Sequence, residues 1–271
     1  MQAVLQPFQT VIDQAIHIIQ QDAEAIGLAA GGSWISGDID AYSDLDLVLV
    51  TTNPVAPDLE SMRAWAARIG TMLASFRGDH VGEPRLLIAL YADPLLHVDI
   101  KFLTLAEFYH RVEDPVILWE RDQQLSAVLS QSMASYPTFD YQGMEDRFWI
   151  WIHYALLKVG RGEYFEALDF IAFVRNVVIG PLLHLKNGNL PRGVRRVETT
   201  ISANDLANLK KTVAMPERNS LLASLVEVIR LYVGLRDQLA PPTLQKNNAA
   251  KEAINEYFAV IQTTAITEVN E

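Results

Sequence analysis

The sequence contains no cysteine among its 271 residues. A chain without cysteine forms no disulfides, which is compatible with a reducing compartment. It also has no uninterrupted run of about eighteen apolar residues, so we expect no membrane-spanning segment. A basic stretch followed by an apolar one is missing from the N-terminal region, and we expect no secretory signal. These absences predict a cytoplasmic protein.

Basic residues are scarce as well. Lysine and arginine number 22 against 33 aspartates and glutamates, which gives a formal net charge of −11. No basic run is longer than a pair such as Arg195 and Arg196. Proteins that grip a nucleic-acid backbone do so with basic surfaces, so this composition disfavours a nucleic-acid partner. An acidic cleft concentrates cations, which favours a small cationic substrate.

Two aspartates open an apolar strand that follows a Gly-Ser turn. Asp44 and Asp46 are separated by one residue, and in a strand such residues point to the same face, roughly 6–7 Å apart. Two carboxylates this close repel each other unless a cation lies between them. Mg²⁺ prefers oxygen ligands, and a pair of such ions is the device of phosphoryl and nucleotidyl transfer. The spacing therefore predicts a site for two Mg²⁺ ions.

The turn before these aspartates has the composition of a phosphate-binding element. Gly31 and Gly32 allow the backbone to turn tightly and to approach a ligand closely. Ser33 is a good N-cap, so we expect a helix to begin there. The free N–H groups and the positive dipole end of a helix N-terminus favour a phosphate. By itself a Gly-Gly-Ser run is an ordinary loop, and its position before the aspartates is what favours a phosphate site.

A third carboxylate lies on a later strand. Residues Leu95–Leu103 alternate with period two, and the face with His97, Asp99 and Lys101 is polar. The other face is apolar and is expected in the core: Leu96, Val98, Ile100 and Phe102. A polar face can simply meet solvent. Because this strand is expected beside the strand of Asp44, we predict Asp99 as the third metal ligand or the general base. Lys101 is expected to pair with a carboxylate, and His97 to lie at the rim.

These motifs resemble those of the DNA polymerase beta-like nucleotidyltransferase superfamily. The resemblance rests on Gly32-Ser33, ten further residues, Asp44-Leu45-Asp46-Leu47 and a later strand with Asp99. The stretch Ser43–Val48 is similar to the small-molecule branch, which includes aminoglycoside and lincosamide nucleotidyltransferases. The strong motif covers about residues 29–50, and the weaker match extends to about residue 103.

The resemblance implies a role for each of these residues. Ser33 would contact the triphosphate, with Gly32 and Ser43 beside it in the nucleotide site. Asp44 and Asp46 would hold Mg²⁺, and Asp99 would complete the metal site or take the proton of the acceptor. The expected substrates are a nucleoside triphosphate, with ATP as the expected nucleotide, and a small acceptor.

Two domains are expected, residues 1–125 and 126–271. The first is predicted as an α/β (α+β) domain with a mixed sheet. Its expected helices are Pro7–Ile26 and Asp58–Phe76, and its expected strands are Leu28–Ala30, Leu45–Thr51, Arg85–Tyr91 and Leu96–Leu103. The second is predicted as an all-α helical bundle. Its expected helices are Glu145–Val159, Tyr164–Leu185, Asn204–Val213, Asn219–Leu239 and Ala249–Ala265.

One stretch of the second half, His153–Leu168, resembles the helix-turn-helix of the family that carries a triphosphate-binding lysine. By that match Lys158 is the lysine, and an ammonium group is a good partner for phosphate oxygens. A lysine at the end of a buried helix can equally extend its charged group to the surface. Glu145, Glu163 and Glu166 are candidates for a base on the acceptor side, and the sequence does not choose among them.

The sequence therefore predicts an Mg²⁺-dependent nucleotidyltransferase that modifies a hydroxyl of a small acceptor, for example one like an aminoglycoside. One alternative is a protein adenylyltransferase of the antitoxin-like kind. The other is a nucleotide-binding protein that keeps the fold without turnover, against which the presence of all three aspartates argues. The sequence leaves the acceptor, the preferred nucleotide and the oligomeric state open.

Overall fold

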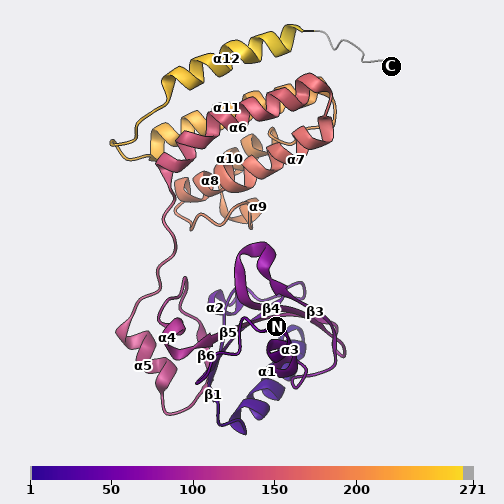
Figure 1. Cartoon of the computed structure of the whole chain (residues 1–271), viewed down its shortest axis with the longest axis vertical. Coiled ribbons are helices and arrows are strands. Elements are labelled where there is room, and N and C mark those ends of the chain that lie inside the picture. The colour runs from indigo at the N-terminus through magenta and orange to yellow at the C-terminus, as the bar shows by residue number, and fades with distance from the viewer. Residues whose placement is uncertain (1, 265–271) are drawn as a thin grey trace. The chain divides into compact units, whose positions relative to one another are not determined.

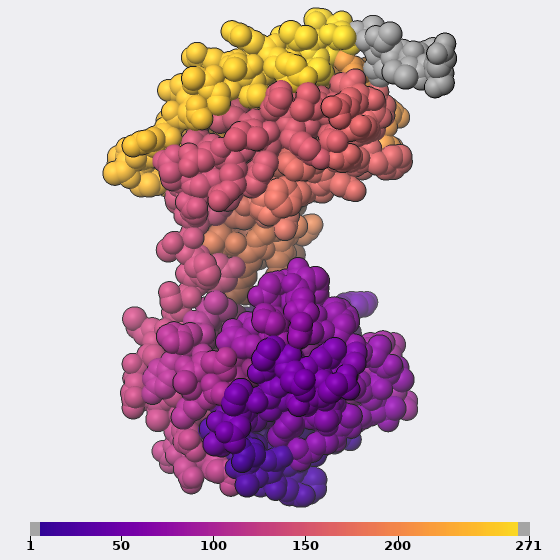
Figure 2. All heavy atoms as spheres, in the orientation of Figure 1, coloured from indigo at the N-terminus to yellow at the C-terminus, as the bar shows by residue number. Residues whose placement is uncertain are grey.

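The chain divides into two units, one ending at Pro137 and the other beginning at Thr138. The computed structural model describes residues 2–264, and the first unit is drawn in indigo to magenta and the second in pink to yellow (Figures 1 and 2). Within the described residues, the first unit carries a sheet and the second only helices. This confirms the predicted fold class. The boundary expected after residue 125 falls inside helix α5, Gln124–Gln131.

The described residues of the first unit form a six-stranded sheet in the order β3-β4-β5-β2-β1-β6. Its strands are β1 Ala25–Ala30, β2 Leu45–Thr51, β3 Met72–Gly78, β4 Glu83–Tyr91, β5 Leu96–Thr104 and β6 Val116–Glu120. The pairing of β2 with β5 is parallel, and the other neighbours run antiparallel, so the sheet is mixed. The parallel pair brings the N-terminal ends of β2 and β5 to the same edge of the sheet.

One face of the sheet is buried under two helices, α1 Gln2–Gln20 and α3 Leu59–Ala66. Side chains alternate between faces along a strand. Leu45 and Leu47 of β2 and Val98 of β5 point to this covered face and belong to its apolar core. The residues between them, including Asp46 and Asp99, therefore point to the opposite face.

The opposite face is covered over the later parts of the central strands. Helix α4, Leu105–Phe108, and helix α5 pack there, and Phe108 and Leu125 form a second apolar cluster with Val50 of β2 and Leu103 of β5. This cluster draws on the C-terminal ends of β2 and β5. Toward the N-terminal ends of the same strands this face carries polar side chains.

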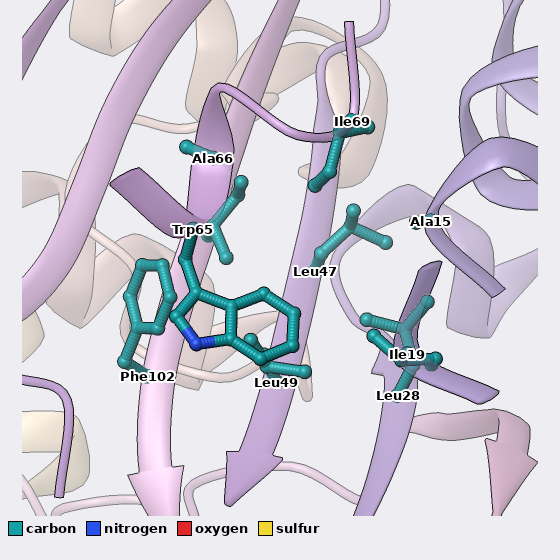
Figure 3. A pocket seen from close by; sticks show the side chains of 10 residues that line it. Ala15, Ile19, Leu28, Leu47, Leu49, Trp65, Ala66, Ile69 and Phe102 are labelled. Carbon is teal, nitrogen blue, oxygen red and sulfur yellow. The ribbon is translucent and has the colours of Figure 1, made fainter. Parts of the chain in front are cut away.

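A small cavity lies between the covered face of the sheet and its helices (Figure 3). Its volume is about 10 Å³, and Ile19, Trp65 and Phe102 are among the side chains around it. A space of this size in an apolar setting is a packing void, because a bound water needs several polar partners. The cavity therefore belongs to the core and not to a substrate site.

The helix expected over residues 58–76 is wrong in its second half. Helix α3 ends at Ala66, and Met72–Gly78 forms β3 at the edge of the sheet. Leu73 and Phe76 are three residues apart, a spacing that also occurs along one face of a helix. An edge strand buries few side chains. Both residues stay exposed, so the strand lacks the clear alternation of a half-buried one.

The second unit is a helical bundle around one apolar core. Its helices are α6 Tyr141–Arg161, α7 Tyr164–Val174, α8 Gly180–Lys186, α9 Val197–Thr200, α10 Ala203–Lys210, α11 Arg218–Leu239 and α12 Asn248–Thr263. One π-helical turn, Arg175–Ile179, joins α7 to α8. In Figure 1, α12 runs along the outer side of the bundle. Of the last expected helix, Ala265 lies outside the described residues.

The continuous helical stretch Tyr164–Lys186 is long and apolar enough to cross a membrane by length and composition. Half of the 18-residue window that meets this test is buried inside the protein. Ile171, Val174 and Val178 are among its fully buried side chains and belong to the core of the second unit. A core helix passes the same test, and the packing of this stretch is that of a core helix.

His184 of α8 is a buried polar group in that core. Its side chain is almost fully covered, and neither ring nitrogen has a hydrogen-bond partner among the residues that the structure describes. Burial lowers the pKa of His184, and the nearby backbone of Arg195 offsets only part of this effect. The folded state therefore favours the neutral ring.

We expect the free energy of unfolding to fall as the pH falls below about 6.5, the ordinary pKa of histidine. Below that value the unfolded chain binds a proton at His184 that the folded chain resists, at a cost of up to about 1.4 kcal/mol per pH unit. Urea unfolding of the parent and of His184→Leu across this range measures the effect. The variant should show the shallower pH dependence, and equal slopes would contradict the prediction.

Candidate active site

Three aspartates meet at the N-terminal ends of β2 and β5. Asp44 directly precedes β2, Asp46 is its second residue, and Asp99 lies on β5. The parallel register places Asp46 opposite Asp99. One carboxylate oxygen from each of the three residues lies within 4.8 Å of the others, and all three side chains are half-buried. The structure thus brings the predicted carboxylates together.

The glycine turn between β1 and α2, Ser33–Ser36, is fitted closely against this cluster. The Gly31 amide donates a hydrogen bond to the Asp46 carbonyl at 2.9 Å. Gly32 has a φ of +56°, and a Cβ atom at this position would lie 1.9 Å from Oδ2 of Asp46. Only glycine fits there, so the turn packs directly against the side chain of Asp46.

The two serines of the predicted nucleotide site have different surroundings. Ser33 is the first residue of α2, and the N-cap position belongs to Gly32, so the expectation that Ser33 caps the helix is wrong. Gly32 takes this position because its positive φ turns the chain into the helix. Ser43 orders the loop before Asp44: its Oγ accepts a hydrogen bond from the Asp40 amide at 2.9 Å and donates one to Asp40 Oδ1 at 3.2 Å.

The carboxylate of Asp99 is affected by both burial and neighbouring charges. Burial raises the pKa of Asp99, and the charge of Asp44 raises it further. Two imidazoles act in the opposite direction: His97, whose Nε2 lies 2.8 Å from Asp99 Oδ1, and His80. The net direction is upward, which makes Asp99 a stronger base than a solvated aspartate.

The cluster suits Mg²⁺. Its donors are carboxylate oxygens, the ligands that this ion prefers, and three of them converge on one side. The repulsion between Asp44 and Asp99 that contributes to the raised pKa of Asp99 is the kind of strain that a bound divalent cation relieves. Asp44, Asp46 and Asp99 are therefore the residues that could hold the metal.

Glu113 contacts the glycine turn, which no pattern in the sequence predicted. It lies in the loop between α4 and β6, and its Oε1 accepts a hydrogen bond from the Gly32 amide at 3.0 Å. Residues 32 and 113 are far apart in the chain, and a single glutamate in a loop has no pattern that predicts such a contact. A fourth carboxylate therefore stands at the glycine turn.

Lys101 pairs with a carboxylate, as predicted. Its Nζ lies 2.6 Å from Glu83 Oε2, in a pair that also includes Arg85 at 2.7 Å from Glu83 Oε1. Burial works to raise the pKa of Glu83, but the hydrogen bonds from Arg85 and Lys101 outweigh it and lower the pKa to about 2. Lys101 therefore anchors β5 to β4.

Lys158 lies near the end of α6 in the second unit, with its side chain 13% exposed. Its Nζ lies 2.8 Å from Glu163 Oε2 and 2.9 Å from Glu166 Oε1. The Tyr154 hydroxyl donates a hydrogen bond to Glu166. The hydrogen bonds to the two glutamates raise the pKa of Lys158. The predicted phosphate-binding lysine is thus held in place by two carboxylates of its own unit.

Glu145 is removed from the acceptor-side candidates by its position. It is fully buried, and Arg236 Nη1 lies 3.0 Å from each of its carboxylate oxygens. Tyr232 Oη, the Asn247 amide and Trp149 Nε1 donate further hydrogen bonds at 2.6, 2.9 and 3.2 Å. Such a carboxylate has a structural role. Glu163 and Glu166 stay as candidates.

In comparisons with known proteins, this chain is similar to several solved structures. No protein-family model matches the chain, and no curated protein does. An aminoglycoside 6-adenyltransferase from Bacillus subtilis is 14% identical with a TM-score of 0.42, covering 94% of this chain and 97% of its own. A nucleotidyltransferase-like protein from Exiguobacterium sibiricum is 13% identical with a TM-score of 0.40, covering 82% and 74%.

A third similar structure is spectinomycin adenyltransferase from Enterococcus faecialis, crystallised with ATP and spectinomycin. It is 13% identical with a TM-score of 0.27, and the match covers 93% of this chain and 98% of its own. The three names are those of nucleotidyltransferases of the kind that the motif resembles. Because every TM-score is below 0.5, the function proposed below depends on the residues of this chain.

Proposed function

We propose that this chain is an Mg²⁺-dependent nucleotidyltransferase that moves a nucleoside monophosphate from a triphosphate, ATP in the first instance, to a hydroxyl of a small cationic acceptor. One observation carries the proposal. Carboxylate oxygens of Asp44, Asp46 and Asp99 lie within 4.8 Å of one another at the N-terminal ends of β2 and β5. A glycine turn fits closely against Asp46. This combination of acids and turn suits two-metal chemistry on a phosphate.

The reaction proposed for the site is an in-line displacement. The acceptor oxygen attacks the α-phosphorus, a new O–P bond forms, and the bond to the pyrophosphate oxygen breaks. Asp99 takes the proton of the attacking hydroxyl, because its carboxylate lies beside those of Asp44 and Asp46, where the acceptor oxygen would approach. Mg²⁺ held by the three aspartates would offset the charge on the attacking and leaving oxygens.

A screen that reads pyrophosphate release in the presence of Mg²⁺ tests the proposal. The four ribonucleoside triphosphates are each combined with a panel of polyhydroxylated amines that includes aminoglycosides. At least one pair is expected to turn over, with an apparent affinity for the amine that weakens as salt is added, because salt screens the attraction to an acidic site. Labelling of a protein by the triphosphate would favour the protein adenylyltransferase instead. Binding of the triphosphate without any turnover would favour the non-catalytic nucleotide-binding protein.

The nucleotide site can be tested separately by calorimetry with a non-hydrolysable triphosphate. Ser33→Ala is expected to weaken binding by roughly 1 kcal/mol, the value of one hydrogen bond. Lys158→Ala should cost about twice as much if the ammonium meets the phosphates, because a charged hydrogen bond is stronger. Arg161→Ala, which removes an exposed neighbouring cation, is the matched control. If Lys158→Ala binds the triphosphate as tightly as the parent, Lys158 has no role in phosphate binding and serves only its ion pairs.

A further inference from the structure

One row of side chains runs across four strands on the face that carries the aspartates. In the register of the sheet, Asp46 of β2 lies opposite Asp99 of β5. Asp99 lies opposite Ile88 of β4, and Ile88 lies opposite Phe76 of β3. Residues opposite each other in register point to the same face. The row therefore consists of two carboxylates followed by two apolar side chains.

The apolar half of this row is open to solvent. Phe76 is 52% exposed, and Leu90, the neighbour of Ile88 two positions along β4, is 38% exposed. On the other face of the same strand, Leu87 and Ala89 are buried in the core. An apolar patch beside a catalytic cluster is more informative than single exposed residues, because scattered ones are common on any surface.

His80 connects the patch to the cluster. It lies in the turn between β3 and β4, and its ring packs on Phe76 with centroids 5.5 Å apart. The charge of His80 also acts on Asp99. The same side chain therefore packs on the aromatic ring at one end of the row and acts electrostatically on the carboxylate beside Ile88.

The order of the strands distinguishes two sides of the cluster. The glycine turn expected to hold the triphosphate follows β1, on one side of the β5-β2 pair, and the apolar patch lies on β4 and β3, on the other side. A triphosphate seated at the turn therefore leaves the patch to the second substrate. This assignment rests on the function proposed above.

We propose that Phe76, Ile88 and Leu90 bind an apolar or aromatic substituent of the acceptor. Neighbouring strands lie about 4.8 Å apart, so this substituent sits about 5 to 10 Å across the sheet from Asp99. The acceptor is then a hydroxylated amine with one apolar arm, and not a molecule that is polar on all sides.

A matched pair of probes tests the proposal. N-methylglucamine and N-benzylglucamine share a hydroxyl chain and an ammonium and differ in the substituent on nitrogen. Calorimetry with the full chain, saturated with a non-hydrolysable triphosphate and Mg²⁺, is expected to show the benzyl compound binding at least about tenfold more tightly, or about 1.4 kcal/mol. Phe76→Ser and Ile88→Thr should reduce this preference to about threefold or less. Leu73→Ser, which removes an equally exposed side chain of β3 from outside the row, should keep it.

Three results would overturn the proposal. Equal or undetectable binding of the two amines would show that the patch does not recognise an apolar arm. Weaker triphosphate binding by Phe76→Ser would assign the patch to the nucleoside. A changed sedimentation mass of Phe76→Ser with an unchanged benzyl preference would assign it to a second copy of the chain. Failure of the proposed function appears differently, as absent pyrophosphate release with every acceptor, whereas the benzyl preference is measured without turnover.

Discussion

The variants Asp44→Asn and Asp46→Asn are each expected to lose at least about a hundredfold in the rate of nucleotidyl transfer. Each replaces a charged oxygen ligand of the three-carboxylate cluster by a neutral amide. Loss of one ligand from a two-metal site removes several kcal/mol of charge stabilisation in the transition state. A hundredfold loss corresponds to about 2.7 kcal/mol, so this expectation is a lower bound.

The measurement is initial-rate pyrophosphate release at saturating Mg²⁺, with thermal unfolding as the check on the fold. With Mg²⁺ removed by a chelator, Asp44→Asn is expected to be at least as stable as the parent, because it removes the repulsion between Asp44 and Asp99. Asp13→Asn, an exposed change on α1, controls for loss of an acid elsewhere in the first unit and should retain the parental rate. Turnover near that of the parent in either cluster variant would rule out the proposed mechanism.

Glu145→Ala is expected to lower the free energy of unfolding by about 3–5 kcal/mol. The substitution leaves the Arg236 guanidinium buried, at 4% side-chain exposure, without the carboxylate that it faces. Breaking a buried ion pair from one side is costly because the remaining charge loses its buried partner. Arg236 then keeps only the more exposed carboxylate of Asp237, 2.9 Å from its Nη2. The hydroxyl of Tyr232 and the amide of Asn247 lose their acceptor as well.

Urea unfolding followed by circular dichroism measures this loss. Glu227→Ala is the control, because Glu227 pairs with Arg230 across one turn of α11 at the surface. An exposed pair of this kind contributes about 0.3–0.5 kcal/mol. Comparable effects of the two substitutions would show that the buried pair has no special weight in the second unit.

The central strands and the aspartates were predictable because their signals are local. The alternation in β5 marks one face as core and the other as polar, and the apolar run after Asp46 marks β2. The alternation of side chains along a strand sets the face on which a carboxylate lies, and this does not depend on distant parts of the chain. The sequence therefore predicted that Asp44, Asp46 and Asp99 meet, and the structure brings their oxygens together.

Features that depend on distant residues were not predictable in the same way. Glu113 reaches Gly32 from another loop, and Glu145 meets Arg236 from a helix far along the chain. The local periodicity of a sequence carries no information about contacts between residues that are far apart in the chain. The prediction for the residues of the edge strand β3 was wrong for a related reason. Phe76 is exposed, and its environment is set by its neighbours in the sheet.

The parallel pairing of β2 with β5 has a thermodynamic consequence. Asp99 joins Asp44 and Asp46 only when two strands from separate parts of the chain are paired. A cation that needs all three carboxylates therefore binds the folded unit and not the unfolded chain. Binding of that kind adds about 2.7 kcal/mol to stability at a hundred times the dissociation constant. If the cluster holds Mg²⁺ as proposed, the melting temperature of the first unit should rise with Mg²⁺ concentration, with neither nucleotide nor acceptor present.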